Sequence, residues 1–348
     1  MHFASDNTGP VHPTIMQALS EANAGYAPSY GTDPLMSEVE TRIREIFEAP
    51  EASVYLVATG TAANCLGLAC LAPPTHTVFC TPNAHIHEDE CNAPEFYTGG
   101  AKLTLVGKTD KMTSHTLRAA IDAEEIRGVH GPQRGPVSLT QATEKGQIYS
   151  LAELCALTEV ARDYALPVQM DGARFANALV TLNCSAADMT WRAGVDVLSF
   201  GGTKNGCMGV EAVVLFDPAR AWEFELRRKR GAHLFSKHRY LSAQMASYLR
   251  DDLWLQTARR ANDNMARLTE GLLTLEGVAL RYPVEANLSF IEMPRAALQR
   301  LQAAGAAFSV YEGVLDGPDP NERLLIRLVA DWAVQSEDIA RFVEIAGG

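Results

Sequence analysis

Short apolar runs alternate with amphipathic segments along most of the chain. Apolar runs bounded by turn residues predict buried strands, and segments whose apolar residues recur with a period near 3.6 predict helices. Strands are predicted over residues 54–58, 77–80, 102–106, 137–140, 168–170, 195–200 and 209–216, and helices over 35–47, 150–165 and 173–179. This alternation predicts an α/β fold in which a mostly parallel sheet lies between two layers of helices.

The two ends of the chain have other patterns. An extended arm over residues 1–12 precedes a short helix that Pro13 and Thr14 open. From Pro218 a long amphipathic stretch predicts helix to about residue 275, and strand-like runs follow at 288–293, 308–311 and 324–329, with helices around Leu298 and from Ser336. We expect a large domain over residues 1–253, with an N-terminal arm over residues 1–30, and a small C-terminal α+β domain over residues 254–348.

A lysine stands where one of the predicted buried strands ends. The strand over residues 195–200 runs into Gly201, Gly202, Thr203 and Lys204. Glycine lets the backbone approach a ligand closely. Burial favours the neutral form of an amine, which can then attack a carbonyl carbon. Lys204 is therefore a candidate Schiff-base residue, although a surface lysine in a glycine-rich turn explains this stretch equally well.

Two other strand ends carry groups that a pyridine cofactor requires. Asp171 follows the strand over residues 168–170, and Arg174 lies three positions further on. A buried carboxylate can keep a ring nitrogen protonated while a lysine binds the aldehyde of the same cofactor. An ion pair between Asp171 and Arg174 at a helix end is the alternative. After the strand over residues 54–58, Thr59, Gly60 and Thr61 open a helix whose free amides can bind phosphate.

Composition narrows the possible partners. The chain has 42 acidic and 30 basic residues, and this net negative charge argues against nucleic acid or an anionic membrane as a partner. No apolar run approaches the roughly 18 residues of a membrane span, and no signal peptide is expected at the start. The seven cysteines have no disulfide spacing, which indicates a reducing compartment. We expect a soluble, cytoplasmic protein.

Residues 80–91 contain several side chains of the types that bind zinc. Cys80, His85 and Cys91 are among them. Because their spacing is loose and matches none of the regular zinc motifs, we expect no metal site. Asp89 and Glu90 are instead expected near the mouth of the site, where they would select among aldehydes.

Together these motifs resemble a known family, the low-specificity threonine aldolases, over nearly the whole length of the chain. The matching stretches, in chain order, are Ser5-Asp6-Asn7, Tyr30-Gly31-Thr32-Asp33-Pro34, Thr59-Gly60-Thr61-Ala62-Ala63-Asn64, His85, Asp171-Gly172-Ala173-Arg174, Thr203-Lys204 and Arg327-Leu328-Val329. The resemblance implies a pyridoxal 5'-phosphate enzyme of fold type I, with a seven-stranded sheet. It also implies a homotetramer, a dimer of dimers that shares its active sites between subunits.

The resemblance also implies roles for individual residues. Lys204 is expected to form the Schiff base, Asp171 to pair with the pyridine nitrogen, and His85 to stack on the ring. The other expected cofactor contacts are Gly60, Thr61, Arg174, Thr203 and Arg239. The substrate carboxylate is expected to meet Ser5, Arg174 and Arg327, because a guanidinium holds a carboxylate at two points. Tyr30, a further expected substrate contact, and Arg239 are expected to reach the site from a neighbouring subunit.

The reaction that the resemblance implies is a retro-aldol cleavage. L-Threonine, L-allo-threonine or a related β-hydroxy-α-amino acid such as phenylserine forms an external aldimine with the cofactor and is cleaved to glycine and an aldehyde. The base is either His85 or a held water, since residues 139–144 lack the second histidine of some relatives. The alternatives are a β-eliminating lyase or a racemase of the same fold, or a non-catalytic protein that binds pyridoxal phosphate.

Overall fold

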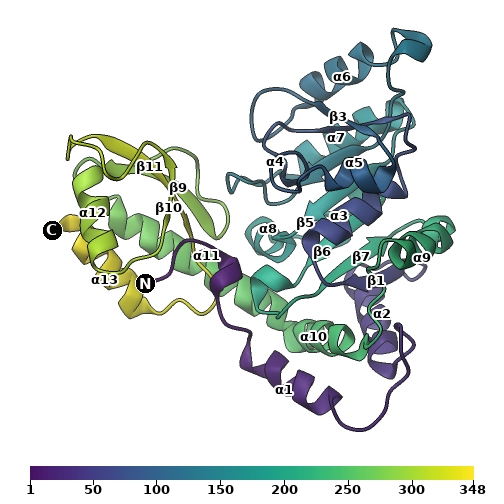
Figure 1. The fold of residues 1–348 in the computed structure, drawn as a ribbon, viewed down its shortest axis with the longest axis horizontal. Coiled ribbons are helices and arrows are strands. Elements are labelled where there is room, and N and C mark those ends of the chain that lie inside the picture. Colours follow the sequence, from purple (N-terminus) through teal and green to yellow (C-terminus); the bar gives the residue numbers. More distant parts are fainter.

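A computed structural model describes residues 1–348 and contains one seven-stranded sheet in the order β1-β7-β6-β5-β4-β2-β3 (Figure 1). The strands are β1 (Ser53–Val57), β2 (Thr77–Cys80), β3 (Lys102–Leu105), β4 (Val137–Thr140), β5 (Val168–Gly172), β6 (Val197–Gly201) and β7 (Glu211–Leu215). All neighbouring strands pair in parallel except β7, which is antiparallel to both β1 and β6. This confirms the predicted mostly parallel seven-stranded sheet.

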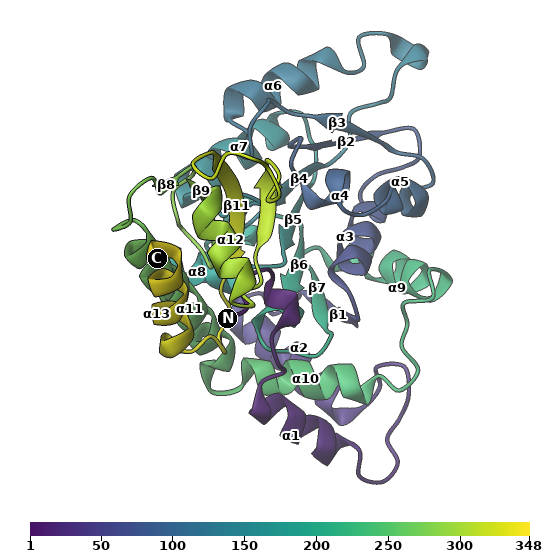
Figure 2. The same cartoon turned by 60° about the vertical axis from the view of Figure 1, so that its left-hand side comes forward.

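Helices cover both faces of the sheet, as the side-chain alternation of the strands requires (Figure 2). Successive residues of β6 face opposite layers: Val197 packs with α3 (Gly60–Ala69), whereas Leu198 packs with the helices on the other face. On the α3 side lie α5 (Ala93–Thr98) and α9 (Ala221–Arg230), and the other side is covered by α2 (Pro34–Ile46), α7 (Leu151–Asp163) and α8 (Phe175–Leu182). The remaining helices of this part are α1 (Pro13–Ala22), α4 (His85–Glu88), α6 (Ser114–Ala123) and α10 (Arg239–Leu249).

The C-terminal part forms a smaller sheet with helices on one side. Its antiparallel strands have the order β10-β11-β9-β8, with β8 (Ala279–Leu280), β9 (Leu288–Pro294), β10 (Ser309–Glu312) and β11 (Arg323–Val329). The helices are α12 (Arg295–Ala303) and α13 (Ser336–Gly347). The N-terminal arm also belongs here spatially, because the Phe3 amide donates to the Ala307 carbonyl and the Val329 amide donates to the Phe3 carbonyl. The arm thus begins against the small sheet and then passes toward the large one (Figure 1).

The segment after Pro218 is helical, as predicted, but it is not one long helix. It is divided into α9, α10 and α11 (Leu253–Leu272). Ala232, Asp251 and Asp252 adopt left-handed backbone angles, with φ of 63°, 52° and 56°, which a continuous helix excludes. Helix α11 packs against both α8 and α13 and so joins the two parts, and the boundary at residue 253 stays a prediction.

None of the helices combines the length and the apolar character that crossing a bilayer requires.

Candidate active site

A cavity of about 270 Å³ opens at the carboxyl ends of the central strands. Six of the predicted site residues line it, namely Gly60, Thr61, His85, Asp171, Thr203 and Lys204. They come from four separate elements, and the parallel strands bring them to one edge of the sheet, where ligands of such folds bind. The other predicted residues, Ser5, Tyr30, Arg174, Arg239 and Arg327, do not line this cavity in a single chain.

Lys204 sits on a short 3-10 turn, Thr203–Asn205, directly after β6. The turn is anchored because the Asn205 side-chain amide donates to the Tyr248 hydroxyl at 2.7 Å and to the Trp254 carbonyl at 2.8 Å. Gly201 permits the strand to approach its neighbour, since a Cβ there would lie 2.4 Å from the Ala173 carbonyl oxygen. The backbone beneath Lys204 is therefore fixed while its side chain reaches the cavity.

The first turn of α3 forms one wall of the cavity. Thr59 caps this helix, because its hydroxyl accepts a hydrogen bond from the Ala62 amide at 3.2 Å. The amides of Gly60 and Thr61 precede the helical hydrogen-bond ladder, so they need an outside acceptor. A Cβ on Gly60 would meet no atom within 4 Å, which shows open space at this point. Free amides, the helix dipole and open space together fit a bound phosphate.

Asp171 lies at the end of β5 and is only 3% exposed. One of its carboxylate oxygens, Oδ1, accepts from the Ala173 amide at 3.0 Å, and Oδ2 accepts from the Asn64 side-chain amide at 2.8 Å. These two bonds hold the carboxylate plane in one orientation. The alternative ion pair between Asp171 and Arg174 does not form, since Arg174 pairs with Asp6. A buried, oriented carboxylate with spare acceptor capacity suits a protonated ring nitrogen.

His85 opens the short helix α4 and is half-buried at the cavity. Its Nδ1 lies 2.8 Å from Oε1 of Glu90, whose side chain is 0% exposed. The hydrogen bond to Glu90 raises the pKa of His85, against the opposing effect of burial, and the charges of Asp171, Glu144 and Glu90 raise it further. The expected position of Glu90 at the mouth of the site is wrong, because Glu90 points inward; Asp89 is exposed.

The cysteines and acids of residues 80–91 do not converge. No group of three or more His, Cys, Asp or Glu side chains in the chain is arranged to hold a metal ion. All seven cysteines are free.

Arg174 and Asp6 form a buried ion pair beside the cavity. Nε and Nη2 of Arg174 donate to the two Asp6 carboxylate oxygens at 2.8 and 3.0 Å, and the two side chains are 7% and 0% exposed. Burial alone would raise the pKa of Asp6, but the charges of Arg174 and Lys204 and the hydrogen bonds from Arg174 and Asn287 outweigh it and lower this pKa. In this structure Arg174 thus fixes the N-terminal arm, and its cofactor and substrate contacts stay predictions.

We expect Asp6→Asn to destabilise the protein by about 3–5 kcal/mol, because Arg174 would keep a buried charge without its partner. Since the Asp6 carboxyl has a lowered pKa, its contribution exists above its unfolded pKa of about 3.9 and is lost as pH falls through the lower folded value. Unfolding in urea at neutral pH measures the effect. Asp163→Asn, which removes the exposed ion pair with Arg118, is the control and should leave the midpoint unchanged.

Arg327 lies on β11, close to the start of the arm. Its Nη2 donates to the Ala4 carbonyl at 3.4 Å, and its Nε is buried without a hydrogen-bond partner. Ser5, the next residue of the arm, caps the short 3-10 helix Asp6–Thr8. A buried guanidinium N–H without an acceptor is costly in a folded protein. The arrangement therefore favours an anionic ligand that binds next to the arm.

Tyr30 and Arg239 lie on another part of the surface. Tyr30 is 47% exposed and its amide donates to the Ser236 carbonyl at 3.1 Å. Arg239 donates from Nη1 to the Gly25 carbonyl at 2.9 Å. Both residues thus belong to the surface formed by residues 25–30 and 236–239, and contact with the cavity of their own chain is absent.

Sequence reasoning assigned no role to four polar cavity residues: Asn7 and Asn64, which lie in the matching stretches, and Glu144 and Glu211. Burial raises the pKa of Glu211 to about 7, although its carboxylate accepts from the Gly202 amide at 2.8 Å. Glu144 follows the carboxyl end of β4, so its position in the chain could have identified it. Glu211 begins β7, which runs antiparallel to its neighbours, and only the pairing of Glu211 with Gly201 reveals its proximity to Lys204.

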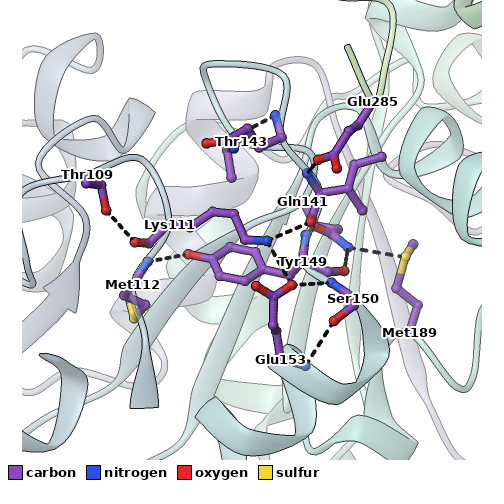
Figure 3. A network of polar contacts seen from close by, with 12 residues as sticks. Thr109, Lys111, Met112, Gln141, Thr143, Tyr149, Ser150, Glu153, Met189 and Glu285 are labelled. Atoms are coloured by element: carbon purple, nitrogen blue, oxygen red, sulfur yellow. Dashed lines mark hydrogen bonds and ion pairs between the residues drawn. The ribbon is translucent and has the colours of Figure 1, made fainter. Parts of the chain in front are cut away.

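The loop that carries Glu144 is held by a polar network (Figure 3). The Gln141 side chain donates to the Tyr149 carbonyl at 2.8 Å and accepts from the Tyr149 amide at 2.9 Å. The Tyr149 hydroxyl accepts from the Met112 amide, and the Ile148 amide donates to Glu285 at 2.7 Å. The bonds between Gln141 and Tyr149 join the two ends of the loop, and Glu144, which the loop carries, lines the cavity.

The fold and this site define a pyridoxal-phosphate-dependent lyase, and comparison with known proteins agrees. The model of the β-eliminating lyase family matches residues 2–295, so the chain belongs to that family. More narrowly, the chain belongs to the low-specificity L-threonine aldolases. It is 40% identical to the low specificity L-threonine aldolase of Pseudomonas aeruginosa and 39% identical to that of a Pseudomonas species, in each case over 89% of both chains.

Solved structures agree with this assignment. A threonine aldolase of Leishmania major superposes with a TM-score of 0.92 at 25% identity, over 99% of this chain and 98% of that one. A serine palmitoyltransferase with a pyridoxal phosphate internal aldimine has the same fold, with a TM-score of 0.71 at 17% identity, over 100% of this chain and 86% of that one. The expected family and fold type are therefore confirmed.

Proposed function

We propose that this enzyme cleaves L-threonine, L-allo-threonine and related β-hydroxy-α-amino acids to glycine and an aldehyde. One observation carries the proposal: Lys204, Asp171, His85 and the first turn of α3 meet in a single cavity. The names of the Pseudomonas and Leishmania relatives support the reaction type. Cleavage of phenylserine belongs to the same proposal.

Pyridoxal phosphate, when bound, accepts the electron pair that remains on Cα after the Cα–Cβ bond breaks. The residues of this chain suit the parts of that cofactor. The amides of Gly60 and Thr61 would hold its phosphate, the Lys204 amine would bind its aldehyde, and the Asp171 carboxylate would keep its ring nitrogen protonated. Thr203, beside Lys204, accepts from the Val210 amide at 3.1 Å and so steadies the turn.

The substrate carboxylate is assigned to Arg327 and Ser5. The unpartnered Nε of Arg327 supports this role, because a carboxylate would satisfy it and the adjacent N–H groups at two points. Holding the carboxylate fixes the rotation of the amino acid about the bond between its amino nitrogen and Cα. This rotation decides which bond to Cα is broken. Arg174 would contribute to this carboxylate site by holding Asp6, the neighbour of Ser5 in the arm.

His85 is the group to which we assign removal of the β-hydroxyl proton. We expect His85→Asn to lower kcat for L-threonine by about 10²-fold, the lower range for loss of a general base. Asparagine keeps a hydrogen-bonding group of similar length but does not titrate. Steady-state assays at several pH values measure the effect, with His87→Asn, an exposed neighbour, as the control. Full turnover by His85→Asn would transfer the role of base to a water or to Glu144.

Assembly and location are further parts of the proposal. We propose a homotetramer in which Tyr30 and Arg239 complete the cavity of a neighbouring subunit, in the cytoplasm. The exposure of Tyr30 and the absence of both residues from the lining of their own cavity support the shared site. Sedimentation analysis tests the tetramer. Mixing Lys204→Ala with Arg239→Ala subunits tests the shared site, because mixed dimers would regain one intact site.

The experiment that tests the reaction is incubation with L-threonine, L-allo-threonine and L-phenylserine. Release of glycine and the matching aldehyde is the expected result. The family also contains β-eliminating enzymes by its description, and β-elimination would yield a 2-oxo acid in place of an aldehyde. A racemase would yield the inverted amino acid, so one product analysis separates all three.

A further inference from the structure

Glu90 is a buried carboxylate that does not line the cavity but touches a residue that does. Its Oε1 lies 2.8 Å from Nδ1 of His85 and accepts from Nδ2 of Asn64 at 3.0 Å. Its Oε2 lies 3.4 Å from the Cys65 sulfur. No arginine or lysine forms an ion pair with this buried carboxylate, so His85 is its one partner that can carry a positive charge. Burying a carboxylate in this way is costly unless hydrogen bonds compensate it.

Asn64 links this carboxylate to the one beneath the cavity. The Asn64 amide group donates to Glu90 Oε1 and, at 2.8 Å, to Asp171 Oδ2. Its carbonyl oxygen accepts from the Gln169 side-chain amide at 3.1 Å, which fixes which end of Asn64 carries the hydrogens. Gln169 is in turn oriented by the Ser138 hydroxyl at 2.7 Å. All residues of this hydrogen-bonded chain except His85 are buried, so water does not compete for their donors and acceptors.

We propose that Glu90 is a positioning residue for the reaction, which holds the proton on Nδ1 of His85 and, through Asn64, ties His85 to Asp171. The bond to Nδ1 leaves Nε2 as the nitrogen that can accept a proton from a molecule in the cavity. Glu90 thereby selects the tautomer that a base requires and stabilises the imidazolium that forms. The proposal rests on the proposed role of His85.

The charges around His85 favour its protonated form. The carboxylates that face it are Glu90 from the α4–α5 connection, Asp171 from β5 and Glu144 from the loop after β4, with the Lys204 amine in the same cavity. The pKa of His85 is raised mainly by the hydrogen bond to Glu90. A raised pKa means that the basic form appears only at higher pH, so removing the charge of Glu90 should expose the base at lower pH.

Two substitutions separate the charge of Glu90 from its hydrogen bonds. In Glu90→Gln the amide oxygen can occupy the place of Oε1 and keep the bonds to His85 and Asn64, while the charge is lost. In Glu90→Leu the acceptor is lost as well. Glu88→Gln removes the same charge from an exposed position of α4 and is the matched control. Circular dichroism and thermal unfolding establish that each variant is folded.

The first measurement uses the full chain without cofactor. Labelled histidine imidazoles are titrated by NMR, and the His85 signal is assigned among the nine histidines with His85→Asn. In Glu90→Gln the midpoint of His85 should fall relative to wild type and Glu88→Gln. An unchanged midpoint would overturn the proposal.

The second measurement is kcat/KM for L-threonine against pH with the holoenzyme. In Glu90→Gln the ascending limb should move to lower pH, and in Glu90→Leu the plateau should fall by about tenfold, because the tautomer is no longer selected. A wild-type plateau in folded Glu90→Leu would overturn the proposal. If the NMR midpoint falls but the rate profile does not move, the contact with Glu90 is upheld and the assignment of His85 as base fails.

Discussion

Replacing Lys204 with alanine should lower kcat for L-threonine cleavage by at least about 10⁴-fold. The reason is that alanine offers no amine to bind the cofactor aldehyde, and no other lysine lines the cavity. The Asn205 anchors to Tyr248 and Trp254 do not involve the Lys204 side chain, so the turn should keep its shape. Loss of activity would then report chemistry and not misfolding.

The measurement combines turnover with chemical labelling. Borohydride reduction of the wild-type protein should fix the cofactor on the peptide that contains Lys204, and Lys204→Ala should show no such adduct. Lys108→Ala, at an exposed position, is the control and should keep both activity and adduct. Recovery of the adduct on Lys145, a buried lysine outside the cavity, would show that the attachment site is wrong.

Asp171→Asn should lower kcat by about 10³-fold, the range seen when one preorganised electrostatic group is removed from a reacting centre. Asparagine fills the same space, but it cannot hold a ring nitrogen protonated as a carboxylate does. It also has one acceptor oxygen in place of two, so it loses either the bond from Asn64 at 2.8 Å or the bond from the Ala173 amide at 3.0 Å. Electron withdrawal from Cα is therefore lost, while binding of the phosphate at α3 remains.

Steady-state kinetics and cofactor titration together test this expectation. We expect a large fall in kcat with a dissociation constant for pyridoxal phosphate that changes far less. Asp171→Glu is the comparison, because it keeps the charge but places it one methylene further along. If Asp171→Asn retained wild-type kcat, the carboxylate would have no role in the electron sink, and a different proton donor to the ring would be required.

The large sheet and the order of its chemical groups could be predicted from the sequence. Its central strands β5 and β6 are buried on both faces, so they read as short, mainly apolar runs, and their ends are marked by glycine or aspartate. Asp171 directly follows such a run, and Gly60 and Lys204 stand two and four positions after theirs. Because parallel strands place their carboxyl ends on one edge, the order of elements was enough to bring these three residues together.

Contacts between residues far apart in the chain could not be predicted in this way. Asp6 and Arg174 are separated by 168 positions, and nothing in the residues around Arg174 shows that its partner lies in the arm. The inward direction of Glu90 was missed for a related reason, since it follows two exposed acids in one run of charge. Local charge patterns report composition but not which side of a short helix faces the interior.

The sequence by itself determined the layered α/β fold, the family and the residues that could bind a pyridine cofactor, because strand burial and strand ends are local properties of the chain. Only the tertiary structure decided which acid pairs with which base. It placed Arg174 against Asp6, Glu90 against His85, and Asn64 between Glu90 and Asp171. The physical reason is that the energy of a buried charge depends on its distance to other charges in space, and folding alone sets that distance.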